Sequence, residues 1–129
     1  MHDLKKALTR AANYLKLTGY VNIVVLEPEI CINLNQEYRG QSYSPDVLSF
    51  AYCEEEVFGE VVINRAYIFG KNRSKGLSFN EKNFLRLSIH GLVHLAGYDH
   101  EVAGCDAKLF FKVERAVLRY LFKSNNKSC

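Results

Sequence analysis

The spacing of apolar and polar residues along the first third of the chain predicts a helix, a strand, a second helix and a loop. Residues 3–17 place apolar side chains at helical spacing with basic side chains on the other faces, which predicts an amphipathic helix that ends at Gly19. Residues 21–26 form a β-branched run of strand length. Residues 29–38 return to helical spacing, and residues 40–45, with the sequence GQSYSP, have the composition of a loop.

The middle of the chain contains two strand-like runs. Residues 47–53 and residues 57–63 are separated by three consecutive glutamates, whose carboxylates favour a solvated turn. The two runs are therefore predicted to form a hairpin or to lie as near neighbours. Residues 71–76, with the sequence KNRSKG, are expected to form a basic loop.

Two long helices are predicted towards the C-terminal end of the sequence. Ser78 and Glu81 fit the capping-box pattern, and the strongly apolar run that follows them is stopped by Gly97. A last helix is predicted over about residues 107–122. Strands that come early and long helices that come late predict an α+β fold, a single domain over residues 1–129, in which the apolar, histidine-bearing helix packs centrally.

The composition fits one globular domain and excludes a two-domain enzyme. The chain has 129 residues, of which 48% are apolar and 24% charged, so it has enough apolar surface for one core and no room for two. Its 17 Lys and Arg against 14 Asp and Glu give a net charge of +3. This small excess permits an anionic partner without requiring one.

The sequence also predicts a cytoplasmic protein with no membrane association. Its longest apolar runs are far shorter than the ~20 residues that span a bilayer, and basic residues interrupt the N-terminal segment where a signal peptide would be apolar. The four cysteines lie far apart and include no Cys-x-x-Cys pair, which fits a reducing compartment.

The density of histidines in one segment is the strongest chemical signal in the sequence. Within HGLVHLAGYDH, His90 and His94 are four residues apart on a predicted helix, ~6 Å along its axis, so both imidazoles can reach one metal ion. Gly97 allows the chain to turn back and bring His100 to the same ion. Three histidines leave one open position on a tetrahedral metal, as in catalytic zinc sites. We expect one zinc ion, although nickel, copper and cobalt accept the same donors.

Other arrangements of this cluster remain open. Cys105 is a possible fourth ligand that would close the site into a structural one. Asp99 and Glu101 are either hydrogen-bond acceptors for the ligand imidazoles or solvated surface carboxylates. The histidine spacing matches the metzincin proteases, but Gly91 stands where those enzymes have their catalytic glutamate, and the only methionine is the first residue.

Three segments resemble a known family. HGLVHLAGYDHE (residues 90–101) is similar to the signature of the YbeY family of bacterial single-strand endoribonucleases, which mature ribosomal RNA, and the resemblance extends to LNQEYRGQSYSPDVLSF (residues 34–50) and GEVVIN (residues 59–64). It implies a mixed four-stranded β-sheet flanked by helices and a functionally critical arginine at Arg39. It also implies that His90, His94 and His100 hold a zinc-like ion.

An RNA substrate requires cations and stacking surfaces, and the sequence offers both. Arg39 can present two parallel donors to a phosphate, although a surface salt bridge is the alternative. Two further basic groups are candidates for RNA contact or are simply solvated. One is a loop with Lys71, Arg73 and Lys75, and the other is a helical stripe with Lys108, Lys112, Arg115, Arg119 and Lys123. Three tyrosines are candidates for base stacking or for ordinary packing: Tyr38, Tyr43 and Tyr98.

These observations predict a metal-dependent endoribonuclease that acts on single-stranded RNA. The resemblance implies roles in rRNA maturation and ribosome quality control, with the ribosome or its proteins as partners, and no DNA substrate is expected. Catalysis is assigned to Arg39 together with His90, His94 and His100. The alternatives are a non-catalytic, ribosome-associated RNA-binding factor with a structural metal, and a metal-dependent hydrolase of another substrate class.

Overall fold

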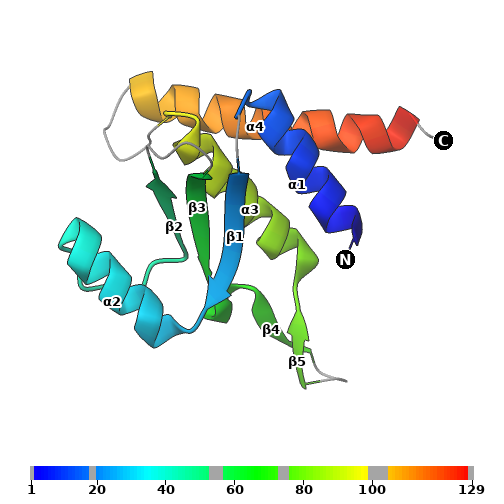
Figure 1. Ribbon diagram of the computed structural model, residues 1–129. Coiled ribbons are helices and arrows are strands. Elements are labelled where there is room, and N and C mark those ends of the chain that lie inside the picture. The colour runs from blue at the N-terminus through cyan, green and yellow to red at the C-terminus, as the bar shows by residue number, and fades with distance from the viewer. Residues whose placement is uncertain (1, 18–19, 53–56, 73–75, 99–104, 128–129) are drawn as a thin grey trace.

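A computed structural model describes the backbone of residues 2–17, 20–52, 57–72, 76–98 and 105–127, and side chains within 4–17, 20–52, 59–70, 78–98 and 107–122. The elements in chain order are α1 (His2–Tyr14), β1 (Tyr20–Leu26), α2 (Pro28–Arg39), β2 (Val47–Ala51), β3 (Val57–Asn64), a 3-10 turn η1 (Arg65–Tyr67), β4 (Phe69–Asn72), β5 (Gly76–Phe79), α3 (Glu81–Leu95) and α4 (Cys105–Lys127) (Figure 1). Within these ranges no helix combines the length and apolar content needed to cross a membrane.

The main sheet is mixed and has β3 in its centre. β1 lies parallel to β3, with Ile23 beside Val61, and β2 lies antiparallel on the other side, with Ser49 opposite Val61. The predicted pairing of the two central strand-like runs is therefore confirmed. The parallel connection from β1 to β3 passes through α2, which covers one face of the sheet.

The expectation of a four-stranded sheet is wrong, because the structure has a three-stranded sheet and a separate two-stranded one. After β3, the Asn64 side chain accepts a hydrogen bond of 3.0 Å from the Ala66 backbone N–H and caps η1. This turn redirects the chain away from the sheet, and β4 then pairs with β5, with Phe69 opposite Phe79. The predicted basic loop over residues 71–76 is wrong at its ends, which belong to these strands.

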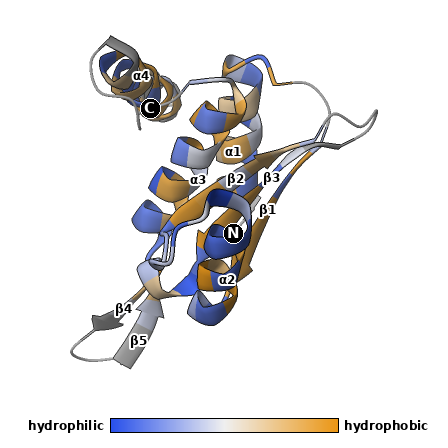
Figure 2. Ribbon diagram, turned by 90° about the vertical axis from the view of Figure 1, so that its left-hand side faces the viewer, coloured by the Kyte–Doolittle hydropathy of each residue, from blue (hydrophilic) through white to orange (hydrophobic). Residues whose placement is uncertain are grey.

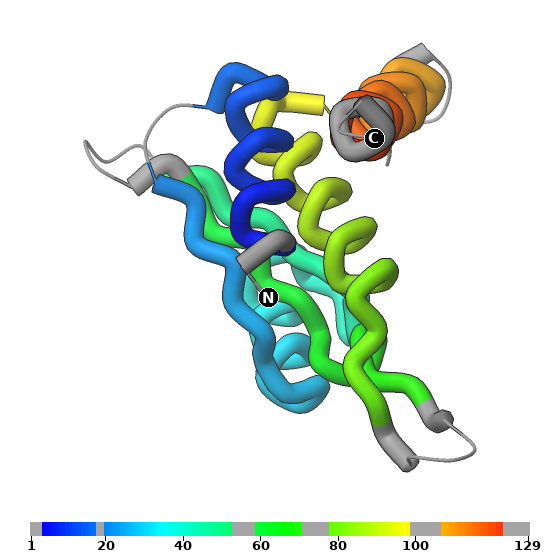
Figure 3. Tube along the Cα trace, turned by 90° about the vertical axis from the view of Figure 1, so that its right-hand side faces the viewer, coloured from blue at the N-terminus to red at the C-terminus, as the bar shows by residue number. Residues whose placement is uncertain are grey.

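Helices cover both faces of the main sheet, and the core lies mainly on the side of α1 and α3 (Figure 3). The strands of the main sheet are predominantly hydrophobic (Figure 2). Seen end-on, α4 lies on the side of α1 and α3 that faces away from the sheet (Figures 2 and 3). The central position predicted for the histidine-bearing helix is confirmed, since α3 contacts β2, β3, α1 and α4.

Several helix boundaries differ from those predicted, and the last helix, α4, is longer than predicted at both ends. The side chain of Asn80, rather than Ser78, caps α3 by accepting a hydrogen bond of 3.1 Å from the Asn83 N–H. Ser78 lies in β5, so it is not available as a cap. The first helix ends at Tyr14, and Lys16 adopts the left-handed conformation, with a φ of 61°. The predicted stop, Gly19, lies outside the described residues.

Candidate active site

His90 and His94 lie together on the side of α3 that faces α4. Their ring centroids are 5.0 Å apart. The buried ring of Phe110, from α4, packs against both, with centroid distances of 4.8 Å to His90 and 4.6 Å to His94. The predicted pairing of the two imidazoles on one helix face is therefore confirmed, and α4 forms the wall behind them.

Each imidazole is anchored through its Nδ1 atom. His90 Nδ1 lies 2.6 Å from the Oε2 atom of Glu114, and His94 Nδ1 lies 3.1 Å from the carbonyl oxygen of Tyr98. A carbonyl oxygen and a carboxylate accept hydrogen bonds, so we assign the proton of each ring to Nδ1. With the proton on Nδ1, the Nε2 atom of each ring is the unprotonated nitrogen, which is the form in which an imidazole nitrogen binds a metal ion.

The turn after α3 orients His94. Gly97 adopts a φ of 101°, the left-handed conformation that was expected at this helix end. The Gly97 N–H donates to the His94 carbonyl at 2.9 Å, and the turn returns the Tyr98 carbonyl to the imidazole of His94.

Glu114 is a site residue that the sequence did not indicate. It is the only acidic residue within residues 107–122, and it lies on the buried side of α4 with Phe110 and Val117, while the basic residues of that helix are exposed. A carboxylate on the apolar side of an otherwise basic helix was the available signal. The two carboxylates proposed for this role, Asp99 and Glu101, lie outside the described residues.

The donor chemistry of the histidine pair fits zinc. Imidazoles with anchored Nδ1 atoms and unprotonated Nε2 atoms are usual zinc donors. Within the described part of the chain there is no group of three or more His, Cys, Asp and Glu residues able to hold a metal. His100 and the side chain of Cys105 lie outside that part, so their roles remain predictions.

Close packing against the sheet explains the glycine at position 91. A Cβ atom there would lie 2.5 Å from the Cγ1 atom of Val61 and 3.1 Å from the Oγ atom of Ser49. The Ser49 hydroxyl donates to the Gly91 carbonyl at 2.9 Å. Position 91 thus faces β2 and β3, and a glutamate there would meet the sheet rather than the histidine pair.

A groove of about 660 Å³ lies along β2 and joins the ends of two helices. Its walls include Arg39 from α2, and His94 and Tyr98 from the end of α3. Arg39 is the last residue of α2 rather than part of the following loop, and Gly40 ends the helix with a φ of 69°. The structure therefore brings the predicted arginine and one of the predicted histidines to the same groove.

Two buried asparagines hold the loop that follows Arg39. Asn35 donates from Nδ2 to the Tyr43 carbonyl at 3.0 Å. Asn64 donates from Nδ2 to the Ser44 hydroxyl at 2.8 Å and to the Pro45 carbonyl at 2.9 Å. Both asparagines are fully buried. These bonds tie the loop to α2 and β3, and thereby support this wall of the groove.

Aromatic side chains also line the groove, although not all of those expected. Tyr38 and Tyr98 belong to its walls, whereas Tyr43 is exposed outside them. Tyr52 is an additional wall residue, and its hydroxyl donates to Glu60 Oε1 at 2.7 Å. Tyr52 directly follows β2, and Glu60 lies on the adjacent strand β3, so sequence spacing does not reveal this contact.

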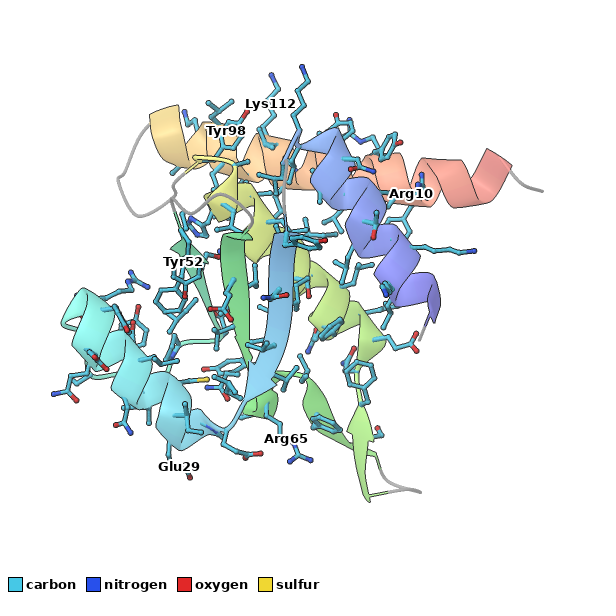
Figure 4. All side chains as sticks on the ribbon, in the orientation of Figure 1. Arg10, Glu29, Tyr52, Arg65, Tyr98 and Lys112 are labelled. Atoms are coloured by element: carbon cyan, nitrogen blue, oxygen red, sulfur yellow. The ribbon has the colours of Figure 1, made fainter. Side chains whose placement is uncertain are left out.

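The described part of the predicted helical stripe lies away from the groove walls. The four described side chains of the predicted helical stripe are exposed on α4: Lys108, Lys112, Arg115 and Arg119. Figure 4 shows Lys112 pointing from α4 away from the body of the protein. The side chains of Lys71, Arg73, Lys75 and Lys123 lie outside the described set.

The fold and the site define a class: an α+β domain whose central helix presents two Nδ1-anchored histidines next to a groove with an arginine on its opposite wall. The model of the family described as Endoribonuclease YbeY matches residues 1–121. The chain belongs to this family.

Relatives named Endoribonuclease YbeY are similar over much of the chain. One from Petrotoga mobilis is 38% identical over 108 residues, which are 83% of this chain and 74% of the relative. One from Thermotoga sp. (strain RQ2) is 36% identical over 96 residues, which are 74% of this chain. The aligned region spans only 63% of that relative's length. A solution structure of a Thermotoga maritima protein aligns with a TM-score of 0.57 and 29% identity over 98% of this chain and 84% of that one.

Proposed function

We propose that this protein is a metal-dependent endoribonuclease that cleaves single-stranded RNA during rRNA maturation and ribosome quality control. The family supports cleavage of RNA, since the similar proteins are named endoribonucleases. The observation that carries the proposal for this chain is the groove that contains both Arg39 and His94. One wall can bind a phosphate and the other can hold a metal ion.

His90 and His94 would hold a zinc ion through their Nε2 atoms, with His100 as the predicted third ligand. When bound, zinc supplies Lewis acidity and a hydroxide-like nucleophile at neutral pH. Glu114 and the Tyr98 carbonyl keep both imidazoles in the required tautomer. Ribosomal proteins are proposed partners of the same function.

Arg39 would bind the phosphate that reacts. Its planar guanidinium can donate two parallel hydrogen bonds to a phosphate and offset the negative charge that grows in the transition state. Tyr38 and Tyr98, on the groove walls, would stack on the flanking bases, which single-stranded RNA leaves accessible. Stacking of this kind tolerates many sequences.

The test is cleavage of a single-stranded rRNA precursor by zinc-loaded, nuclease-free protein. We expect His94→Ala and Arg39→Glu each to lower the rate roughly 100-fold or more, because each removes a group that acts on the reacting phosphate. Arg86→Glu is the charge-matched control, since Arg86 is exposed on α3 and is not part of the groove. Single-stranded DNA of the same sequence should remain intact.

Unchanged cleavage by either variant would contradict the proposal. RNA binding without turnover, together with unfolding on chelation, would instead identify a binding factor with a structural metal. Cleavage of casein would indicate a hydrolase of another class. Elemental analysis of the purified protein identifies the metal in each case.

A further inference from the structure

The outer face of α4 carries a row of exposed cations. Lys108, Lys112, Arg115 and Arg119 recur every three or four residues, so they lie on one side of the helix and extend over about 16 Å of its axis. All four are exposed. We call these four residues the α4 stripe.

No ion pair involves the α4 stripe within the described residues. The only acidic side chain within residues 107–122, Glu114, is turned inward and bonded to His90. The helix thus uses its carboxylate to orient a candidate metal ligand, and its outer face retains four positive charges, more than the net charge of +3 of the whole chain. A row of this kind attracts a polyanion.

The two ends of the α4 stripe can be placed by the residues next to them on the helix. Its first residue, Lys108, lies two residues before Phe110, whose ring packs on both histidines. Its last residue, Arg119, precedes Tyr120, whose ring lies 4.8 Å from that of Tyr14 in α1. The stripe therefore begins in the same turn of α4 as Phe110, on the opposite side of that helix from the histidine pair, and follows α4 across the top of the molecule as seen in Figure 1.

Two features favour RNA over a membrane surface. An interfacial helix inserts its apolar face into lipid, whereas the apolar face of α4, with Phe110, Val117 and Leu121, is buried in the core. Phe111 and Phe122, beside the stripe, are 43% and 54% exposed, and exposed aromatic rings next to cations are typical of surfaces that bind nucleic-acid strands.

We propose that the α4 stripe is a docking surface for the phosphate backbone of RNA, separate from the groove in which cleavage occurs. This inference rests on the proposed function, because it assigns the stripe to the part of a long RNA that extends beyond the groove. Contacts to phosphates are independent of base sequence. The stripe would therefore increase affinity for long RNA without affecting the cleavage step.

The experiment compares two triple variants of equal charge. The stripe variant is Lys112→Gln, Arg115→Gln and Arg119→Gln, which keeps Lys108 because that residue shares a helical turn with Phe110, the residue that packs on both histidines. The control is Lys6→Gln, Lys82→Gln and Arg86→Gln, which removes three exposed cations from α1 and α3. Binding of a long, unstructured RNA is measured at several salt concentrations in a His94→Ala background, so that the RNA stays intact.

We expect the stripe variant to bind the long RNA roughly tenfold more weakly. The slope of log affinity against log salt concentration should also be shallower by about 2, because each of the three lost phosphate contacts contributes ~0.7. The control should match the unsubstituted protein. In the background with His94 present, cleavage of an oligonucleotide of about four nucleotides, short enough for the groove alone, should change less than about twofold in the stripe variant.

Equal losses in both triple variants, or no loss in the stripe variant, would overturn the inference. So would equal binding of polyglutamate or of phosphatidylserine vesicles, which would indicate an acidic protein or a membrane as the partner. If the protein cleaves no RNA but the two triple variants still differ in binding, the proposed function fails and the docking surface stands. If cleavage is observed and the triple variants bind alike, only the docking surface fails.

Discussion

The two histidines of α3 have different partners at Nδ1, and this difference has chemical consequences. His90 bonds to a carboxylate, whereas His94 bonds to a neutral carbonyl. A carboxylate partner raises the basicity of the other ring nitrogen, so His90 is expected to be the stronger metal donor of the two. Both partners fix the ring orientation before any metal arrives.

Replacement of Glu114 should weaken metal binding. We expect Glu114→Gln to lower zinc affinity about tenfold and Glu114→Ala up to about 100-fold, because the anchor of His90 is first made neutral and then removed. Competition with a chromogenic chelator measures the affinity. The ¹⁵N shifts of the His90 ring in metal-free protein report whether Nδ1 still carries the proton.

The control for this experiment is Glu37→Gln, which neutralises an exposed carboxylate on α2. If zinc affinity were the same in the Glu114 variants and in this control, the contact between Glu114 and His90 would have no part in metal binding.

The raised pKa of the Cys31 thiol predicts that the protein loses stability in alkaline solution. Burial raises the pKa of this thiol above its ordinary 9.0, and the nearby Glu27 carboxylate raises it further. Above the ordinary thiol pKa the unfolded chain loses its proton while the folded chain retains it, so the free energy of unfolding decreases as pH rises through the raised pKa. At lower pH the thiol is protonated in both states and contributes no pH dependence.

Urea unfolding of the native protein and of Cys31→Ala between about pH 7 and about pH 10.5 tests this linkage. The variant should be less stable at neutral pH, because Cys31 is buried, but its stability should decrease less steeply above the thiol pKa. Parallel curves for the two proteins would show that Cys31 does not contribute to the alkaline transition.

At the scale of elements, two glycines place α3 for different reasons. Gly91 allows the helix to approach β3, whereas Gly97 supplies a left-handed turn in open space, with no atom within 4 Å of an added Cβ. We expect Gly91→Ala to cost about 1–3 kcal/mol through overpacking against Val61 and Gly97→Ala about 1 kcal/mol through backbone strain.

Urea unfolding distinguishes these two causes. Gly70→Ala is the control, because its φ is not in the left-handed region and an added Cβ has no atom within 4 Å. Addition of Val61→Ala should partly restore the Gly91→Ala protein, since the clash lies between these two residues, and should not restore Gly97→Ala. Gly91→Ala as stable as the control would contradict the packing explanation.

The sequence predicted most helices and strands because their apolar periodicity matches their burial. It failed in the region from β4 to the start of α3, where short strands do not alternate in polarity. Ser78 and Asn80 both precede a helical run, and only the pairing of β5 with β4 shows that Asn80 is the cap. Lys16 at the end of α1 has no sequence signal at all, since left-handed turns favour glycine.

For the candidate site, the spacing of residues in the sequence was sufficient to predict which residues of one helix lie together. It was not sufficient to predict contacts between residues of different elements. His90 and His94 share a helix face, so their pairing was predictable from the sequence. Glu114 and Tyr52 reach the site through contacts between helices and between strands. These contacts depend on how the elements pack, which spacing alone does not specify.

At the scale of the whole molecule, the core consists of apolar side chains packed between the sheet and the helices. Most of the fully buried side chains come from β3, α3 and α4 and include Val61, Ile63, Leu92, Phe110 and Val117. This continuous apolar packing holds α3 between the sheet and α4. The histidine pair lies at the margin of the core and is partly exposed.

Removal of metal should therefore leave the protein folded. We expect chelation to leave the far-ultraviolet circular dichroism spectrum unchanged. The free energy of unfolding should decrease only by the linkage term for a bound ligand, about 3 kcal/mol at a hundredfold excess of metal over its Kd, and the Tm should decrease accordingly. Thermal melts with zinc and with chelator measure this. Loss of the spectrum at 25 °C on chelation would assign the metal a structural role.

The groove also sets the order in which its parts are synthesised. Its arginine ends α2, whereas its histidine lies near the end of α3, so these two lining residues are made at different times during translation. N-terminal segments emerge from the ribosome first, and the residues of β1, α2, β2 and β3 all precede those of α3. A nascent chain therefore contains Arg39 before it contains His94. Under the proposed function, cleavage would require that Tyr98 has emerged and that α3 has docked on the sheet, so a partly synthesised chain would leave the messenger being read intact.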